Sequence, residues 1–141
     1  MPSRHLSIRI AEELFDHLDA ASRRSGRTRS EIAKTLIEEG LRIEQHPGIV
    51  FRAGPAGRRP GILGGPDVWE IVRVFRQVPD ETADAVGWVA EQGNLRADQV
   101  RTALRYYAAY QQEIDRWIDE GEDESRRAEE AWLREQALLA G

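Results

Sequence analysis

Apolar residues follow two different periods in the first third of this 141-residue chain. Leu6, Ile8 and Ile10 alternate with polar residues, which predicts a short strand with one apolar and one polar face. Beyond this segment the apolar positions recur every third or fourth residue, over residues 12–25 and again as far as Gln45. That spacing places them on one side of a helix, so the pattern predicts a strand followed by two amphipathic helices.

The turn between the two predicted helices carries stop and start signals. Gly26 is the residue type that most often ends a helix, because it adopts the left-handed conformation at low cost. Thr28 and Glu31 have the spacing of a capping box, in which a hydroxyl and a carboxylate satisfy free amides at a helix start. Ala11 offers no capping side chain to the first helix, whose start therefore depends on the two glutamates that follow and the helix dipole.

The predicted strand has no partner within the first 46 residues, and a core of this size is too small to fold alone. The simplest solution is a dimer in which the strands of two chains pair antiparallel and four helices cover the apolar face. His5, Ser7 and Arg9 then form the exposed face of a two-stranded ribbon. Such a ribbon fits the major groove of DNA, so these side chains are candidates for base contacts. Arg9 could instead serve only to protect an edge strand.

Two segments, Arg4–Ile10 and Gly26–Ala33, together resemble the ribbon-helix-helix family of dimeric repressors and antitoxins. The resemblance covers about a third of the chain. It implies that the three polar strand residues read DNA bases and that the turn before the second helix anchors the DNA backbone. The residues assigned to phosphate contacts are Arg4, Arg27, Thr28, Arg29 and Ser30.

A second group of elements follows the helix-breaking sequence His46-Pro47-Gly48. Its pattern predicts a β-hairpin and three helices, an arrangement like a helix-turn-helix unit. The expected elements are strands at Ile49–Arg52 and from Arg58, and helices from Asp67, over 80–91, and from Ala97 with a stripe that continues to Ile118. Gly57–Pro60, Gly65–Ile71 and Val100–Ala108 resemble a domain of unknown function found in bacterial antitoxins. That resemblance implies a toxin partner of the PIN-like ribonuclease class.

The net charge of −5 resides in the last 23 residues, which hold three basic and eight acidic side chains. Five acids fall within residues 119–124, a run that predicts a solvated hinge before an amphipathic tail helix. The tail is expected to order on a partner, to pack on the second domain, or to pair in the dimer. Its candidate toxin-binding residues are Arg126, Arg127, Trp132, Arg134, Leu138 and Leu139.

Other classes of function find little support in the composition. The chain has no cysteine, and its histidines at positions 5, 17 and 46 lack the spacing of metal ligands. No nucleophile motif or carboxylate pair suggests catalysis, so we expect no enzyme activity, no cofactor and no metal. No apolar stretch approaches the roughly 20 residues that span a bilayer, and early charged residues argue against a secretory signal. A cytoplasmic protein without membrane partners is expected.

These patterns together predict a mainly α-helical protein in three parts. Residues 1–46 form the ribbon-helix-helix domain, 48–118 the helix-turn-helix-like domain, and 119–141 the acidic hinge and tail helix. The expected function is that of a homodimeric repressor that binds double-stranded operator DNA and acts as the antitoxin of a PIN-like toxin. The leading alternative is a stand-alone repressor whose second domain senses a ligand or adds DNA contacts. A further alternative is an interaction adaptor that uses the ribbon-helix-helix only to dimerise.

Overall fold

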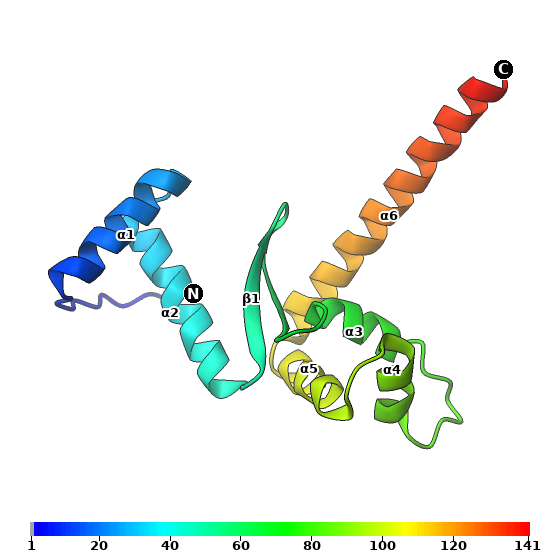
Figure 1. Cartoon of the computed structure of the whole chain (residues 1–141), viewed down its shortest axis with the longest axis horizontal. Coiled ribbons are helices and arrows are strands. Elements are labelled where there is room, and N and C mark those ends of the chain that lie inside the picture. The colour runs from blue at the N-terminus through cyan, green and yellow to red at the C-terminus, as the bar shows by residue number, and fades with distance from the viewer. Residues whose placement is uncertain (1) are drawn as a thin grey trace. The chain divides into compact units, whose positions relative to one another are not determined.

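The computed structural model describes residues 2–141, which form six helices and one two-stranded antiparallel sheet (Figure 1). In chain order the elements are α1 (Glu12–Ser25), α2 (Arg29–Gln45), β1 (Ile49–Gly54), β2 (Gly57–Ile62), α3 (Val68–Phe75), α4 (Ala85–Gly93), α5 (Ala97–Ala109) and α6 (Gln111–Ala140). The chain divides into two compact units, the first ending at Arg42 and the second comprising Ile43–Gly141. Within residues 2–141, no helix has the length and apolar character needed to cross a bilayer.

Helices α1 and α2 form where the sequence predicts them, and their ends follow the local signals. The preceding Ala11 gives α1 no side-chain cap. Gly26 ends α1 with a φ of 70°, and its amide donates a hydrogen bond to the Ser22 carbonyl. At the start of α2, the Thr28 hydroxyl accepts a hydrogen bond of 3.1 Å from the Glu31 amide. Local side-chain chemistry therefore sets the turn between these helices.

The strand predicted over residues 5–10 does not form within the chain. Residues 2–11 belong to no helix or strand, and the one sheet among the described residues follows the two helices. A β-ladder requires a partner for its amides and carbonyls, and one chain offers this segment none. The ribbon between two chains therefore stays a prediction.

The second unit opens with the predicted hairpin. Strands β1 and β2 pair in the register Ile49↔Ile62 through Gly54↔Gly57, so Pro55 and Ala56 form the two-residue tip. Gly57 has a φ of 117°, a backbone conformation that residues with a side chain rarely adopt. A hairpin followed by three helices is the arrangement that the sequence predicts for this region.

One hydrophobic core holds this unit together. It joins the hairpin to α3, α4, α5 and the first part of α6. Its buried members are Ile49, Ile62, Val68, Ile71, Val72, Val89, Val100, Ala103, Tyr106, Ile114 and Ile118. At the start of α3, the Glu70 carboxylate accepts a 3.0 Å hydrogen bond from the Asp67 amide, which satisfies a donor outside the helix.

Two helix boundaries in this unit differ from the predictions. Helix α4 begins at Ala85, several residues after the predicted start at residue 80. The Asp84 carboxylate accepts the Gly87 amide at 2.9 Å, so this residue is the N-cap. The stripe from Ala97 to Ile118 is divided between α5 and α6, because Tyr110 leaves the helical region with φ −132° and ψ 44°.

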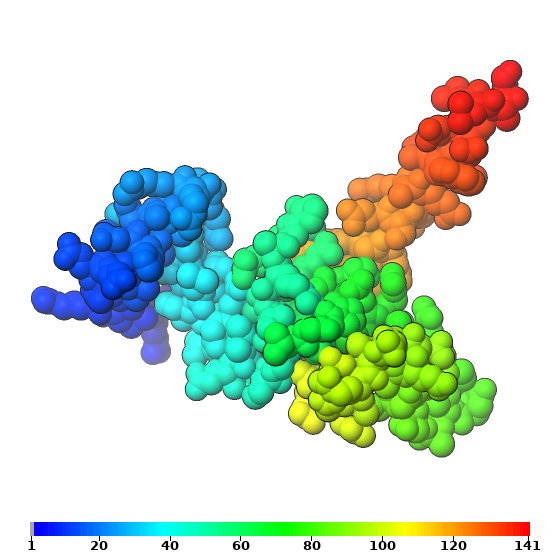
Figure 2. Space-filling model, viewed as in Figure 1, coloured from blue at the N-terminus to red at the C-terminus, as the bar shows by residue number. Residues whose placement is uncertain are grey.

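The predicted acidic hinge is wrong, since residues 119–124 lie inside α6. Gly121 packs this part of the helix against α3: a Cβ added there would lie 3.0 Å from the Trp69 ring. The acidic side chains of this turn repel one another, which disfavours a helix. The contact with Trp69 stabilises the helix at this position and offsets that repulsion. Figure 2 shows the remainder of α6 standing clear of the body of its unit.

Candidate nucleic-acid interface

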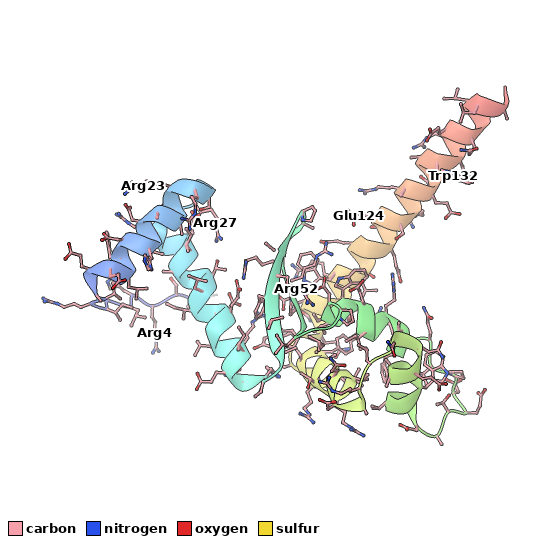
Figure 3. The ribbon with its side chains drawn as sticks, viewed as in Figure 1. Arg4, Arg23, Arg27, Arg52, Glu124 and Trp132 are labelled. Atoms are coloured by element: carbon pink, nitrogen blue, oxygen red, sulfur yellow. The ribbon has the colours of Figure 1, made fainter. Side chains whose placement is uncertain are left out.

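The three predicted base-contacting residues lie exposed ahead of α1. His5, Ser7 and Arg9 alternate along this segment with Leu6 and Ile8, which are 68% and 66% exposed. Arg4 is exposed in the same segment, where Figure 3 labels it. Both the polar and the apolar row of the segment are therefore free to meet another molecule.

The apolar row extends onto the helices of the first unit. Among residues 2–42, Ile32 is the one hydrophobic side chain that is buried. Large apolar side chains are exposed at Leu6, Ile8, Ile10, Leu14, Phe15, Leu36, Ile37 and Leu41. A soluble monomer rarely exposes so many apolar side chains in so small a unit, so this surface is typical of an interface with another protein.

The predicted phosphate contacts of the turn meet at the start of α2. The Arg27 guanidinium donates to the Thr35 hydroxyl at 2.9 Å, and Arg29 donates to the Asp19 carboxylate at 3.0 Å. The Arg29 guanidinium also lies 5.0 Å from the centre of the Phe15 ring. These contacts hold two cations beside the start of α2, where a phosphate would compete for them with Asp19 and with the Glu31 carboxylate, which lies 3.9 Å from the Arg27 guanidinium. Thr28 and Ser30 are exposed at the same place.

Asp19 is a residue of this region that sequence reasoning missed. Its carboxylate accepts hydrogen bonds from Arg23 and Arg29. The hydrogen bond from Arg23 is the largest cause that lowers the pKa of Asp19, with Arg29 adding to it. The signal was available in the spacing of four residues between Asp19 and Arg23, which places them side by side on a helix. Figure 3 labels Arg23 and Arg27 near the turn.

No protein-family model matches this chain, and no match was found among curated proteins or solved structures. The physical character of the exposed residues is therefore the basis for a function. For the first unit, that character combines an uncovered apolar row, a polar row that alternates with it, and cations beside a helix start.

The predicted toxin-binding residues all lie in the second half of α6. Arg126, Arg127, Trp132, Arg134, Leu138 and Leu139 are each exposed. Trp132 is 56% exposed and Leu138 is 82% exposed, although both are large apolar side chains. Arg126 donates to the Asp123 carboxylate at 2.6 Å, so its charge is partly neutralised within the helix.

Proposed function

We propose that this chain is a dimeric DNA-binding repressor that acts as the antitoxin of a PIN-like ribonuclease toxin. The observation that carries the DNA-binding part is the alternation ahead of α1, where apolar and polar side chains are exposed in turn. An extended segment sends successive side chains to opposite faces. If this segment pairs with another strand, its apolar face must be covered by other apolar side chains. Its polar face stays exposed and can contact another molecule.

A second copy of the chain is the best occupant of the uncovered apolar row. An antiparallel pair of identical segments is self-complementary about a twofold axis, so one surface serves both partners. Covering a leucine, isoleucine or phenylalanine contributes about 1.5–3 kcal/mol per side chain. The eight exposed side chains of the first unit thus provide a large driving force for dimerisation.

DNA is the partner that suits the opposite face of that ribbon. His5, Ser7 and Arg9 from two chains would line one surface, and a two-stranded ribbon has the width to enter the major groove. Arg9 can donate two hydrogen bonds to a guanine, whereas serine and histidine can pair with several bases. Arg4 and the residues that open α2 would contact the flanking phosphates.

The antitoxin part of the proposal has a different support. The second unit resembles an antitoxin-associated domain in the segments given above, and the exposed half of α6 offers apolar side chains to a partner. The test is growth of cells that express the reading frame adjacent to this gene, with and without this chain. We expect growth arrest that the chain reverses; no toxicity from either neighbour would leave a repressor without a toxin.

DNA binding is tested with a duplex that carries the region upstream of the chain's own gene. Arg9→Ala should weaken binding by about 1–3 kcal/mol and leave the dimer intact. Arg24→Ala removes the same charge from the exposed end of α1 and is the control, with a smaller expected loss. The affinity of the unmodified chain should fall steeply with salt, because phosphate contacts release counterions. Equal losses in the two variants would contradict base reading by Arg9.

A further inference from the structure

Helix α6 leaves the body of its own unit about a third of the way along its length. Ile118 is fully buried, and the Trp69 ring lies against Gly121. Every residue from Glu124 to Gly141 is exposed, and Figure 3 labels Trp132 on this part. A helical segment of this length without tertiary contacts is marginal in water, so a surface that covers it would stabilise it.

One side of this exposed segment carries a row of side chains at alternating spacings of three and four residues. Such spacings keep side chains on one side of a helix and are those by which two helices pack in a coiled coil. The row consists of Ser125, Ala128, Trp132, Glu135 and Leu139. Two members are small, two are large and apolar, and one is an acid. A fitting partner therefore supplies large side chains opposite the small ones and a polar group opposite the acid.

A second copy of α6 that runs antiparallel meets these requirements in one register. When Ala128 lies opposite Trp132 of the second copy, Ser125 lies opposite its Glu135, and the twofold axis repeats both pairs. The small alanine leaves room for the indole ring, so the seam can pack closely. The serine hydroxyl can donate a hydrogen bond to the glutamate carboxylate, which gives the acid a partner within the seam.

The ends of the seam favour the same register. Leu139 of the second copy then reaches the level of Gly121, where the Trp69 ring covers the row. A shift of one heptad in one direction would place Trp132 opposite Glu135 of the other copy. A shift in the other direction would place it opposite Gly121, which the Trp69 ring already covers.

The charges along α6 favour an antiparallel over a parallel pair. Residues 119–124 hold five acids and no base, whereas residues 136–141 hold no charged side chain. The antiparallel pair places each acidic run beside the uncharged end of the other helix, while a parallel pair would bring the two runs together. One like-charge contact remains at the centre of the seam, between the two copies of Glu129. Each has Arg126 three residues away on its own helix, which moderates the repulsion.

We propose that the exposed part of α6 pairs antiparallel with the same part of a second copy, with Ala128 against Trp132. This pair adds a second self-complementary surface to the one proposed for the first unit, and it rests neither on DNA binding nor on a toxin. Because the seam is short, the pair forms at high protein concentration and separates before the core of the unit unfolds. A toxin that binds Trp132 or Leu138 would compete with it.

The test uses spin labels on the full chain, which has no cysteine of its own. In the proposed register, labels on the two copies of Leu133→Cys are offset by six residues along the helix axis, or about 9 Å. Labels on Ala140→Cys are offset by twenty residues, or about 30 Å. Pulsed electron paramagnetic resonance should therefore give a clearly shorter distance at residue 133. Equal distances would show a parallel pair, and the lack of a short distance at residue 133 would show no pair; either result overturns the proposal.

Matched substitutions then test the seam itself. Ala128→Glu places an unpaired charge in it and should raise the dissociation constant of the chain labelled at residue 133 about 30-fold or more. Ala137→Glu makes the same change on the opposite side of α6 and should alter that constant less than about twofold. Equal effects of the two substitutions would contradict the assigned seam. Denaturant unfolding of each variant verifies that the core of the unit is retained.

A second matched pair makes the opposite prediction. Glu129→Gln removes the like-charge contact, so it should lower the dissociation constant by about two- to fivefold. Glu130→Gln makes the same change one residue further along, on the side away from the seam, and should leave the constant unaltered. Weaker association of Glu129→Gln would overturn the register, since the two copies of this residue would then not face one another.

Discussion

The two units of this chain are both mainly helical and amphipathic, yet they differ in what covers their apolar residues. Over its described residues, 2–42, the first unit buries one apolar side chain, Ile32, and exposes eight large ones. The second unit buries eleven in a single core. The same kind of periodicity thus produces a unit whose core is complete within one chain, although the second half of its helix α6 is exposed, and a unit whose apolar surface requires another molecule. Periodicity predicts the helix, but it does not identify the source of the surface that covers it.

The largest expected effect concerns the incomplete unit. Ile8→Ala removes apolar volume from the proposed seam between two chains, where the isoleucine occurs twice. Because truncation of a packed isoleucine costs about 2–5 kcal/mol, the two sites of the dimer together should weaken dimerisation by about 4–10 kcal/mol. Sedimentation equilibrium over a range of concentrations measures the association constant.

Ser7→Ala is the control for this variant. Ser7 is adjacent in the sequence and lies in the polar row, so its truncation should leave the association constant within a few-fold of the unmodified chain. An Ile8→Ala protein that dimerises as tightly as the Ser7→Ala protein would show that the apolar row is not the seam. The exposed apolar row of the first unit would then not account for its association.

A somewhat smaller effect is expected from the complete unit. Tyr106 is fully buried, with its ring 5.2 Å from His46 and 4.6 Å from Tyr110. Tyr106→Ala should lower the free energy of unfolding of the second unit by about 3–5 kcal/mol. All four tryptophans lie in this unit, so tryptophan fluorescence during denaturant unfolding reports it selectively. The midpoint should be independent of protein concentration; a concentration-dependent midpoint would mean that this unit also requires a partner.

Local chemistry explains why some elements could be predicted from the sequence. Gly26 and Thr28 act within a few residues of themselves, so the ends of α1 and α2 follow from residue type. The hairpin follows from a run of β-branched and aromatic residues before a glycine-rich turn. Residue type alone does not always locate a helix start. Asp80 and Asp84 both precede α4, and either could cap it by residue type. The acidic run in α6 is a second limit, because the contact of Gly121 with Trp69 is tertiary.

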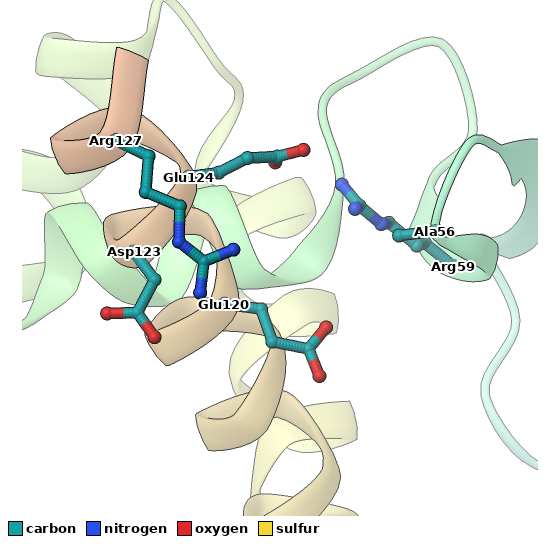
Figure 4. Close-up of a pocket in the computed structure, with 6 residues that line it drawn as sticks. All are labelled: Ala56, Arg59, Glu120, Asp123, Glu124 and Arg127. Carbon is teal, nitrogen blue, oxygen red and sulfur yellow. The ribbon is translucent and has the colours of Figure 1, made fainter. Parts of the chain in front are cut away.

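The candidate site shows a similar division. The alternation of His5, Ser7 and Arg9 with apolar residues is visible in the sequence, and the structure finds both rows exposed. The contacts that fix Arg29 could not be predicted, since they depend on how α1 lies against the start of α2. The hollow between the tip of the hairpin and α6, lined by Ala56, Arg59, Glu120, Asp123, Glu124 and Arg127 (Figure 4), was also missed, because its two walls come from residues about sixty positions apart.

An intermediate loss of stability is expected where Gly61 lies close to the Arg52 side chain in the second unit. A Cβ added at Gly61 would lie 1.9 Å from Nη2 of Arg52, whose guanidinium pairs with Asp67 at 3.2 Å. Gly61→Ala should displace that guanidinium and lower the free energy of unfolding by about 1–2 kcal/mol. Gly54→Ala, in the partner strand, meets only an ordinary contact at 3.6 Å and serves as the control. Equal stabilities of the two variants would show that Arg52 repositions without cost.

The smallest effect concerns exposed charges in the first unit. Asp19 has a pKa below its ordinary value of 3.8, mainly because Arg23 donates a hydrogen bond to its carboxylate. A carboxyl whose pKa is lowered by folding stabilises the folded state above its unfolded pKa, and this contribution is lost as the pH falls through the lower folded value. Arg23→Ala should therefore raise the pKa of Asp19 toward 3.8, with Arg29 keeping it somewhat lower. Titration of the Asp19 carboxyl by NMR measures the change, and Arg24→Ala, one residue further along α1, should leave that pKa unaltered. An unchanged pKa in Arg23→Ala would mean that Arg29 alone holds the carboxylate, and the cation beside the start of α2 would then be less available to a phosphate.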